Sequence, residues 1–525
     1  MVSSPLTQSE IRLAEPIAAL CLATDLATGQ PLEHGFRRAL LGVWLGEELG
    51  LSRHELSNVY FVALLGTVGC TIEGAAFARF FKDDIAFGEQ IVLRDPTRPI
   101  EMAAFFLRKI GEGDPPSRRA RKVLSAALLG PTESQIICRD VALQVGEMLE
   151  LGPEIRQAVG QCHEHWDGRG GPRRLKGEEL SLAARIFRIA HDAEIFNRVG
   201  GGEAAVGVIR QRAGKVYDPR IADRFCEVAG HLLSRLESET TWDEVLATEP
   251  APVRLLSLQE FDSMAQTVAN FVDMRSAYTL GHSPRVAAVA EIAARALGLS
   301  DAEATALRHA GLLHDLGRAG VPVAVWNKRE PLTASEWDRM KRHPSFTELV
   351  LARSSALGHL GILAGLHHER LDGSGYRGVP ASFLSVAAQV LAVADAYQTK
   401  LESRPHREAM TPDVAAEEVQ RQANQGRFDS EVVAAILAAA GHQAPASKKR
   451  EWPAGLSDRE IDVIRLAVRG LSNRQIAETL FLSPKTVGHH IEHIYNKIGV
   501  STRVGATLFA LNHDLVQKAA GADAS

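Results

Sequence analysis

The sequence predicts an all-α protein that folds as several domains. Its 525 residues correspond to three or four domains at roughly 150 residues each. Segments with apolar residues at helical spacing dominate; residues 285–297, for example, place their larger apolar side chains on one stripe, which stops at Gly298. Alternating strand patterns are scarce, only 6% of the residues are aromatic, and the frequent Ala, Leu and Arg residues favour helices further.

The charge balance limits the classes of binding partner. The chain has 59 Lys and Arg residues against 64 Asp and Glu residues, which gives a formal net charge of −5. This balance argues against a basic nucleic-acid-binding coat over the whole protein, although one small DNA-reading module is compatible with it. With 45% hydrophobic and 23% charged residues, the chain can bury several ordinary cores.

Nothing in the sequence predicts a membrane span or a signal peptide. The longest apolar stretches, such as residues 432–441, are shorter than the about 20 residues that cross a bilayer. Near the start, Glu10, Arg12 and Glu15 interrupt any apolar run. The five cysteines show no paired spacing, which is typical of a reduced protein. We therefore expect a cytoplasmic protein without a membrane partner.

Two stretches rich in Pro, Ser and charged residues, 236–252 and 441–455, predict linkers that divide the chain. Around the first linker the sequence repeats itself: His34 precedes Gly66 by 32 positions, as His282 precedes His314. We therefore expect two copies of one helical domain, in residues 1–240 and 253–445, and a small third domain in residues 453–516.

The second copy carries a dense set of side chains that commonly bind metal ions. Imidazole and carboxylate groups together suit divalent ions such as iron, manganese and zinc. An adjacent His-Asp pair on a helix points two ligands about 100° apart, so that they reach neighbouring ions. Paired ions can activate water and clamp the attacking and leaving oxygens of a phosphoester. A single histidine is more often a core or surface residue, but seven ligand-type residues together favour metal binding: His282, His314, Asp315, His343, His367, His368 and Asp395.

The motifs around these residues resemble those of the HD-GYP family, a branch of the HD-superfamily metal-dependent phosphohydrolases that act on cyclic di-GMP. They run in family order across roughly residues 262–442 and include Leu-His-Asp-Leu-Gly at 313–317 and His-His-Glu-Arg-Leu-Asp-Gly-Ser-Gly-Tyr at 367–376. The resemblance implies that the seven residues coordinate a centre of two or three iron ions. The family's third metal is associated with a Glu where this chain has Tyr278. Two divalent ions, iron or manganese, are therefore expected.

Two departures from the family pattern concern the substrate side of the site. The family usually has Lys where this chain has Arg318, and the resemblance implies that Arg318 contacts the substrate phosphate and acts with Asp315 in catalysis. Arg keeps the positive charge, but it is longer and planar. The Pro of Gly-Tyr-Pro is absent after Gly375 and Tyr376, which the resemblance places beside the substrate. Two interpretations stay open: hydrolysis of cyclic di-GMP, or binding of a nucleotide without turnover.

The first copy lacks the residues that would complete such a centre. By the same spacing, Gly66 and Thr67 replace the central His-Asp pair, which removes the bridge that a two-metal site needs. A degenerate, non-catalytic domain with a sensory or dimerising role is expected. The remaining ligand-type residues either form a softer single-metal site, because thiolate and imidazole favour zinc, or are ordinary buried residues. They are His34, Cys138, Cys162, His163 and His191.

From residue 456 onward the sequence predicts a helix-turn-helix module. Ser457 caps a helix with an acidic first turn, a second helix runs from Asn473 to Leu480, and a turn at 481–483 leads into a third helix that begins at Pro484. Two short helices joined by a tight turn can place the second one in the major groove of DNA. The module resembles the LuxR-type (NarL/FixJ-like) DNA-binding domain, a four-helix fold, over roughly residues 453–516. The helix at 502–512 is then the expected dimerising helix.

The LuxR-type resemblance also implies which side chains meet DNA. Lys485 and Thr486 are expected at phosphate and base edges, Val487 at a thymine methyl group and His489 at the backbone, with His490 on the same polar side. The alternative is a small helical protein-interaction domain. We expect a bacterial transcriptional regulator that binds promoter DNA as a homodimer and takes a cyclic dinucleotide as its substrate or effector.

Overall fold

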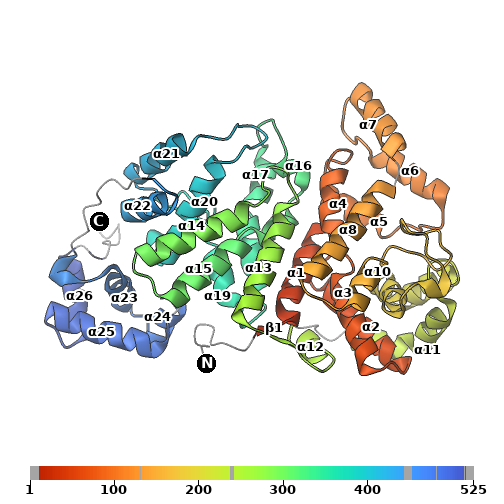
Figure 1. Cartoon of the computed structure of the whole chain (residues 1–525), viewed down its shortest axis with the longest axis horizontal. Coiled ribbons are helices and arrows are strands. Elements are labelled where there is room, and N and C mark those ends of the chain that lie inside the picture. The colour runs from red at the N-terminus through yellow and green to blue at the C-terminus, as the bar shows by residue number, and fades with distance from the viewer. Residues whose placement is uncertain are drawn as a thin grey trace, which may run out of the picture.

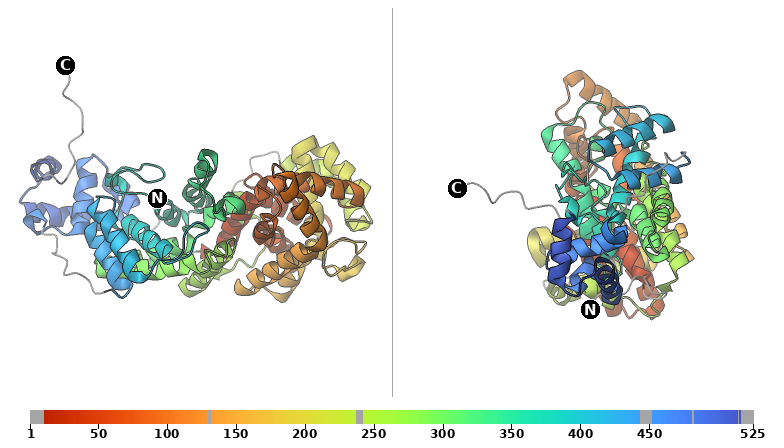
Figure 2. Two further views of the ribbon diagram at one scale, coloured as in Figure 1. Left: turned by 90° about the horizontal axis from the view of Figure 1, so that it is seen from above. Right: turned by 90° about the vertical axis from the view of Figure 1, so that its left-hand side faces the viewer.

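The computed structural model describes residues 11–129, 132–236, 242–442, 452–480, 482–513 and 515. The expected all-α fold is confirmed, since within these residues the elements are helices apart from two strands of two residues each. The molecule is elongated, with two helical halves in line and the C-terminal helices beside the second half (Figures 1 and 2). Parts of the expected linkers (237–241 and 443–451), residue 481 of the expected turn and the expected domain ends at 1, 240, 445 and 516 lie outside the described residues.

The first half of the chain is built around the packed helices α2, α3 and α10. Its elements, in chain order, are β1 (Ile11–Arg12), α1 (Ala14–Ala27), α2 (His34–Glu48), α3 (Arg53–Leu65), α4 (Cys70–Phe77), α5 (Asp84–Ile91), α6 (Pro99–Lys109), α7 (Pro116–Leu129), α8 (Thr132–Met148), α9 (Pro153–Val159), η1 (Gly177–Glu179), α10 (Leu182–Arg212), α11 (Pro219–Arg235) and α12 (Trp242–Ala247).

The second half is built around α14, α15 and α20, and the C-terminal module follows it. The elements are β2 (Leu255–Leu256), α13 (Leu258–Asp273), α14 (His282–Ala296), α15 (Asp301–Leu313), η2 (Leu316–Gly320), α16 (Val323–Trp326), α17 (Ala334–Met340), α18 (His343–Leu351), α19 (Gly358–Ala364), η3 (Ala381–Phe383), α20 (Val386–Lys400), α21 (Pro412–Asn424), α22 (Ser430–Ala439), η4 (Pro453–Gly455), α23 (Asp458–Val468), α24 (Asn473–Leu480), α25 (Pro484–Ile498) and α26 (Arg503–Asn512).

Helix starts recur at matching places in the two halves. Ser52 and Ser300 cap α3 and α15, and each forms a capping box with the glutamate three residues later, Glu55 or Glu303. The helices α2 and α14, which precede them, both follow a residue in the left-handed backbone region. The repeat in the sequence therefore has a counterpart in local structure.

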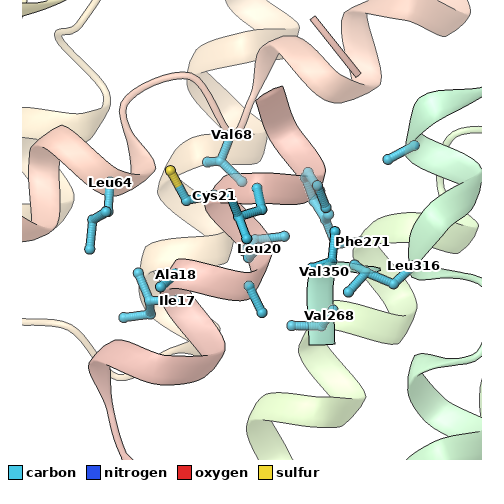
Figure 3. Packing of buried hydrophobic residues seen from close by; sticks show 14 of the residues in the cluster. Ile17, Ala18, Leu20, Cys21, Leu64, Val68, Val268, Phe271, Leu316 and Val350 are labelled. Atoms are coloured by element: carbon cyan, nitrogen blue, oxygen red, sulfur yellow. The ribbon is translucent and has the colours of Figure 1, made fainter. Parts of the chain in front are cut away.

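Helix α1 fastens the two halves to each other. It lies between α13 of the second half and α4 of the first (Figure 1), and Leu20 packs in one buried cluster with Phe271 and Leu316 (Figure 3). The hydroxyl of Ser354 donates a hydrogen bond to Glu15 of α1 at 3.0 Å, and β1 pairs antiparallel with β2. One continuous hydrophobic core therefore runs through both halves.

One buried stretch corrects the expectation about apolar segments. The 20 residues Arg53–Ile72 have the length and apolar composition of a membrane span, although 67% of the apolar 18-residue window within them is buried inside the protein. It comprises α3, a turn and the start of α4, which lie in the core of the first half. Its apolar character is explained by this packing.

The C-terminal helices form a core of their own and rest on the second half. Ser457 caps α23 in a capping box with Glu460, as expected from the sequence, and α26 begins one residue later than expected. Two arginines make the contact: Arg459 pairs with Glu303 at the start of α15, and Arg469 lies over the ring of Phe383 in η3, 5.2 Å from its centroid.

Candidate metal centre

The seven expected ligands converge at one place in the second half, and we call them the His–Asp centre. They stand on five different segments, at or near helix ends. His282 begins α14, His343 begins α18, and Asp395 lies within α20. The adjacent pairs His314–Asp315 and His367–His368 follow α15 and α19.

The position of the central His-Asp pair differs from the expectation. The sequence placed both residues on a helix, but α15 ends at Leu313, and Asp315 has φ −94° and ψ 6° before η2 begins. The backbone N–H of Gly317 donates to the Thr347 hydroxyl at 2.8 Å, and this hydroxyl donates to the carbonyl of His314. These bonds to α18 hold the pair in a turn, and the two side chains end close together, with Nε2 of His314 3.6 Å from Oδ2 of Asp315.

Asp315 lies between two groups of histidines. Its Oδ2 is 3.8 Å from Nε2 of His282 and 3.6 Å from Nε2 of His314. Its Oδ1 is 3.4 Å from Nε2 of His343 and 3.8 Å from Nε2 of His367. The two oxygens of one buried carboxylate thus face two separate imidazole pairs. This is the arrangement that a ligand bridging two cations requires.

Asp395 contacts members of both groups as well. Its Oδ1 is 3.2 Å from Nε2 of His282, and its Oδ2 is 3.5 Å from Nδ1 of His368. The donor atoms form two clusters in which all lie within 4.8 Å of one another: His282, His314 and Asp315 in the first, His343, His367 and His368 in the second. The centre therefore consists of two neighbouring groups of candidate metal ligands.

Backbone carbonyls fix the orientation of three histidine rings. His314, His343 and His367 each direct Nδ1 to the carbonyl three residues earlier, at 2.6 to 2.7 Å, which leaves Nε2 pointing toward Asp315. Nε2 of His314 is buried and has no hydrogen-bond partner among the described residues. An oriented imidazole with an unused buried nitrogen fits a divalent metal ion as its partner.

The protonation states of the histidines differ across the centre. Burial lowers the pKa of His343 to about 4 and that of His367 to about 3, so both rings are neutral at pH 7, the form that binds metal. Burial also opposes protonation of His282, but the carboxylates of Asp395 and Glu402 outweigh it and raise its pKa to about 9. Binding of a cation at His282 is therefore expected to release a proton.

Glu402 is a site residue that the sequence reasoning missed. Its two carboxylate oxygens lie 3.0 and 3.2 Å from Nδ1 of His282, and it also accepts hydrogen bonds from Arg285 and Gln398. A carboxylate behind a ligating imidazole fixes the ring and raises its basicity. Glu402 follows Asp395 by seven positions, about two helical turns, and this spacing is the signal that points to it.

Arg318 lies against the centre itself. Its Nη1 donates to Oδ2 of Asp315 at 2.8 Å, and its guanidinium lies 4.0 Å from the ring centroid of Trp326. Burial opposes ionisation of Asp315, but Arg318 and the surrounding histidines together outweigh it and hold the pKa of the carboxyl well below its usual range. Trp326, which the sequence reasoning also missed, therefore sets where this guanidinium lies.

The other two residues expected at the substrate are beside the centre. The ring of Tyr376 lies 4.2 Å from that of His368, centroid to centroid. At Gly375, a Cβ atom would approach Cα and Oε2 of Glu369 to 2.6 Å, so that no larger residue fits without a shift. The loop is thus packed closely over the second group of histidines.

In the first half, an arginine side chain lies among the remaining histidines. Nη1 of the completely buried Arg38 is 3.5 Å from Nε2 of His34 and 3.4 Å from Nδ1 of His191. At Gly66, which replaces the histidine of the central pair, a Cβ atom would lie 2.3 Å from the ring of Phe187. These contacts leave no room for the two-cation arrangement of the second half.

The sequence left open whether the five remaining ligand-type residues of the first half form a single-metal site or are ordinary buried residues, and the structure does not bring all five together. Nε2 of His34 lies 3.2 Å from Nδ1 of His191, and both nitrogens lie beside the guanidinium of Arg38. The thiol of Cys162 instead donates to the carbonyl of Ala158. The remaining two, Cys138 and His163, form a separate group with a third residue, Cys70, which the sequence reasoning missed.

The residues expected to bind DNA lie on α25, and one of them is not accessible. Lys485 and His489 are exposed, and Thr486 and His490 are partly exposed. Val487 is 0% exposed and belongs to the core of the C-terminal module. The expected contact of Val487 with a thymine methyl group is therefore corrected: this side chain packs the helix onto its own domain.

Comparison with known protein families agrees with this architecture. Residues 94–221 and 266–432 match the family described as HD domain. The chain belongs to the HD-domain family. In this HD-domain protein, residues 454–510 match a second family, described as bacterial regulatory proteins, luxR family. Both resemblances expected from the motifs are confirmed.

Relatives of this HD-domain protein include cyclic-dinucleotide phosphodiesterases. The 3′3′-cGAMP-specific phosphodiesterase 3 of Vibrio cholerae is 30% identical over 416 residues, which are 78% of this chain and 90% of that protein. The cyclic di-GMP phosphodiesterase response regulator RpfG of Xanthomonas campestris is 34% identical over 210 residues, 39% of this chain and 55% of that protein. A crystal structure of a cyclic GMP-AMP specific phosphodiesterase of V. cholerae (V-cGAP3) superposes with a TM-score of 0.56 at 26% identity, covering 82% of this chain and 98% of that chain.

Proposed function

We propose that this HD-domain protein hydrolyses a cyclic dinucleotide at the His–Asp centre and binds promoter DNA through its LuxR-type module. The observation that carries the proposal is the placement of Asp315, with one oxygen toward His282 and His314 and the other toward His343 and His367. The named substrates of the relatives, 3′3′-cGAMP and cyclic di-GMP, support the substrate class. Cyclic di-GMP is the substrate we propose to test first.

The seven residues of the centre would hold two divalent ions, iron or manganese. Such ions would supply positive charge for the phosphodiester, and they would lower the pKa of a bound water so that hydroxide is available to attack it near neutral pH. Asp315 would bridge the two positions, and Glu402 would keep His282 oriented through Nδ1. Arg318, already positive and buried beside Asp315, would steady the substrate phosphate, with Gly375 and Tyr376 closing that side.

Turnover of nucleotide by purified protein tests this proposal. The protein is incubated with manganese or iron(II) and with cyclic di-GMP or 3′3′-cGAMP in parallel, and the linear dinucleotide and mononucleotides are quantified. Asp315→Ala is expected to abolish hydrolysis of both substrates, whereas Asp413→Ala, at a side chain that is 92% exposed, is expected to leave it unchanged. Absence of any product from the wild-type protein with either metal contradicts the hydrolase proposal.

A second candidate function is a sensor that binds a nucleotide without turnover, and the ion pair between Arg318 and Asp315 favours it. A guanidinium bonded to the bridging carboxylate competes for the charge that a metal ion would use. The variant Arg318→Lys separates the two functions, because lysine is the residue usual in HD-GYP domains and makes a smaller, single point of charge. Hydrolysis retained or increased in this variant supports the enzyme; nucleotide binding without product in both forms supports the sensor.

The proposed DNA-binding surface is the exposed side of α25. Lys485, Thr486, His489 and His490 would face the duplex, while Val487 holds the helix on its core. A double change, Lys485→Ala with His489→Ala, is expected to weaken binding of promoter DNA and to reduce its dependence on salt. Unchanged affinity of the double variant contradicts this docking.

We also propose how the two activities are joined. Arg469 of the DNA-binding module donates to the carbonyl of Ser382 at 3.3 Å, on the segment that follows the Tyr376 loop. Ligand bound at the centre would change this contact, provided it prefers one arrangement of the module over the other. We propose a cytoplasmic homodimer with α26 as the dimerising helix, and domains at 1–240, 253–445 and 453–516.

A further inference from the structure

We propose that the first half holds one zinc ion, or a similar soft divalent cation, on Cys70, Cys138 and His163. Their donor atoms all lie within 4.8 Å of one another, and Sγ of Cys70 is 3.3 Å from Nε2 of His163. Two sulfur ligands and one imidazole are a donor set that selects zinc over the ions preferred by histidine and carboxylate. With three protein ligands, the fourth position of a tetrahedral ion would be filled by water.

The three residues come from separate parts of the chain and are held together by a close backbone contact. Cys70 begins α4, Cys138 lies in α8, and His163 follows α9. At Gly69 a Cβ atom would lie 2.0 Å from the carbonyl oxygen of Cys138, so only glycine lets the turn before α4 approach α8 this closely. The approach brings the next residue, Cys70, beside Cys138.

The same contact exists in the second half, and it identifies the origin of the site. A Cβ atom at Gly317 would also lie 2.0 Å from a carbonyl oxygen, that of His343. Gly317 follows Gly69 by 248 positions, as His282 follows His34. Cys138 therefore stands in the place of His343, and by the same register Cys70 stands in the place of Arg318. The first half thus has a thiol where the second half has a cationic side chain, and this thiol lies beside Cys138, the counterpart of His343.

The place beside His34 and His191 is already filled. The guanidinium of Arg38 lies between His34 and His191, so the first half has room for one ion. The hydrogen bond with Cys138 lowers the pKa of the Cys70 thiol well below its ordinary value, against the effect of burial, and His163 lowers it further. The thiolate, which is the form that binds metal, is thereby favoured.

The proposed ion would stabilise the contact between the two halves. The carbonyl of Thr71, the residue after Cys70, accepts a hydrogen bond from Nη1 of the buried Arg275 at 2.7 Å. Arg275 belongs to the second half and lies between α13 and α14. An ion that ties the start of α4 to α8 would therefore also hold the hydrogen-bond acceptor of Arg275 in place.

Substitution with cobalt(II) tests the site in the full-length protein. A thiolate–cobalt bond gives a charge-transfer absorption in the near ultraviolet, which the cysteine-free His–Asp centre does not produce. The reduced wild-type protein is expected to show this absorption and to lose about one zinc equivalent per chain when Cys70 is changed to Ser. The control Cys226→Ser, at a half-buried cysteine elsewhere in the first half, is expected to keep both the absorption and the zinc.

Each outcome decides the proposal. Loss of the absorption in Cys70→Ser but not in Cys226→Ser supports the site, and a lower melting temperature after removal of zinc from the wild type supports its structural role. The proposal is overturned if the reduced wild-type protein shows no thiolate–cobalt absorption. Mass-spectrometric detection of a disulfide between Cys70 and Cys138 in protein purified under reducing conditions also overturns it. Neither readout depends on nucleotide hydrolysis, so failure of the proposed function leaves this test intact.

Discussion

The variant Glu402→Gln tests the His–Asp centre through a residue that is not one of its seven expected ligands. Glutamine keeps the size of the side chain and an oxygen that can accept a hydrogen bond, but it removes the negative charge behind His282. In the structure this charge lies 3.0 Å from Nδ1 of His282 and is 9% exposed, so solvent screens it weakly. Its loss makes the Nε2 of His282 a poorer donor to a cation.

The size of the effect follows from the role of Glu402 as a positioning residue. Mutation of the residue that orients a metal ligand from behind typically costs about 10- to 100-fold in metal affinity, which corresponds to about 1.4 to 2.7 kcal/mol. Among the seven expected ligands described in the structure, Glu402 is hydrogen-bonded to His282, whereas His343 and His367 are fixed by backbone carbonyls. We therefore expect one of two binding steps to weaken and the other to stay unchanged.

Metal titration by calorimetry, combined with metal analysis of the purified protein, measures the two steps separately. The matched control is Glu417→Gln, at an exposed glutamate on α21. Nucleotide turnover is expected to fall with occupancy of the weakened position and to recover at high metal concentration. If Glu402→Gln binds two ions with wild-type affinity and has wild-type turnover at limiting metal, the assignment of Glu402 as a positioning residue for His282 is wrong.

Three further predictions concern the C-terminal module. Val487→Ala is expected to destabilise the module by about 2 kcal/mol through lost core packing, measured by calorimetry. Lys485→Ala is expected to leave the melting temperature unchanged and to lower the salt slope of DNA binding by about 1. Equal effects of the two changes on stability would contradict the difference in burial between the two side chains. Burial raises the pKa of Asp462 to about 6, so the folded state holds a proton that the unfolded state releases and stability is lost as the pH rises from about 4 to about 6. Asp462→Asn is expected to remove this loss of about 1 to 3 kcal/mol, seen as a flatter dependence of unfolding on pH, and an unchanged slope would refute it. Arg469→Ala is expected to make DNA affinity, measured by fluorescence anisotropy, insensitive to cyclic dinucleotide. A retained response would exclude the contacts of Arg469 with Ser382 and Phe383 as the link.

The ligands of the His–Asp centre could be predicted because each belongs to a short motif. His314 and Asp315 are adjacent, and so are His367 and His368, which restricts the chemistry that the pairs can perform whatever the helix boundaries are. The prediction of a helix for the central pair failed because the geometry depends on a contact distant in sequence. The Thr347 hydroxyl of α18 binds the turn, and no local pattern contains that information.

Residues that act through long-range packing were harder to predict. Cys70 becomes a candidate metal ligand only because Gly69 lies close to Cys138, which is 69 positions away in the sequence. Arg38 looks like an ordinary residue four positions after His34 until the fold buries it. The role of α1 in joining both halves could not be predicted either, because its apolar residues predict a buried helix but do not indicate which helices pack against it.

The two halves solve one electrostatic problem in different ways. Each buries carboxylates and imidazoles in the middle of a helical domain, where an uncompensated negative charge is costly. In the first half the compensating groups are side chains: the imidazole of His34 and the guanidinium of Arg38 lower the pKa of Asp25, although burial outweighs them and raises it to about 6. In the second half Arg318 offers Asp315 the same kind of partner, but Nε2 of His314 still has no hydrogen-bond partner among the described residues. Arg318 alone thus leaves a metal-binding nitrogen of the second half without a partner, which is why we expect a cation there. In the first half the guanidinium of Arg38 occupies the space between His34 and His191, so we expect no cation at that place.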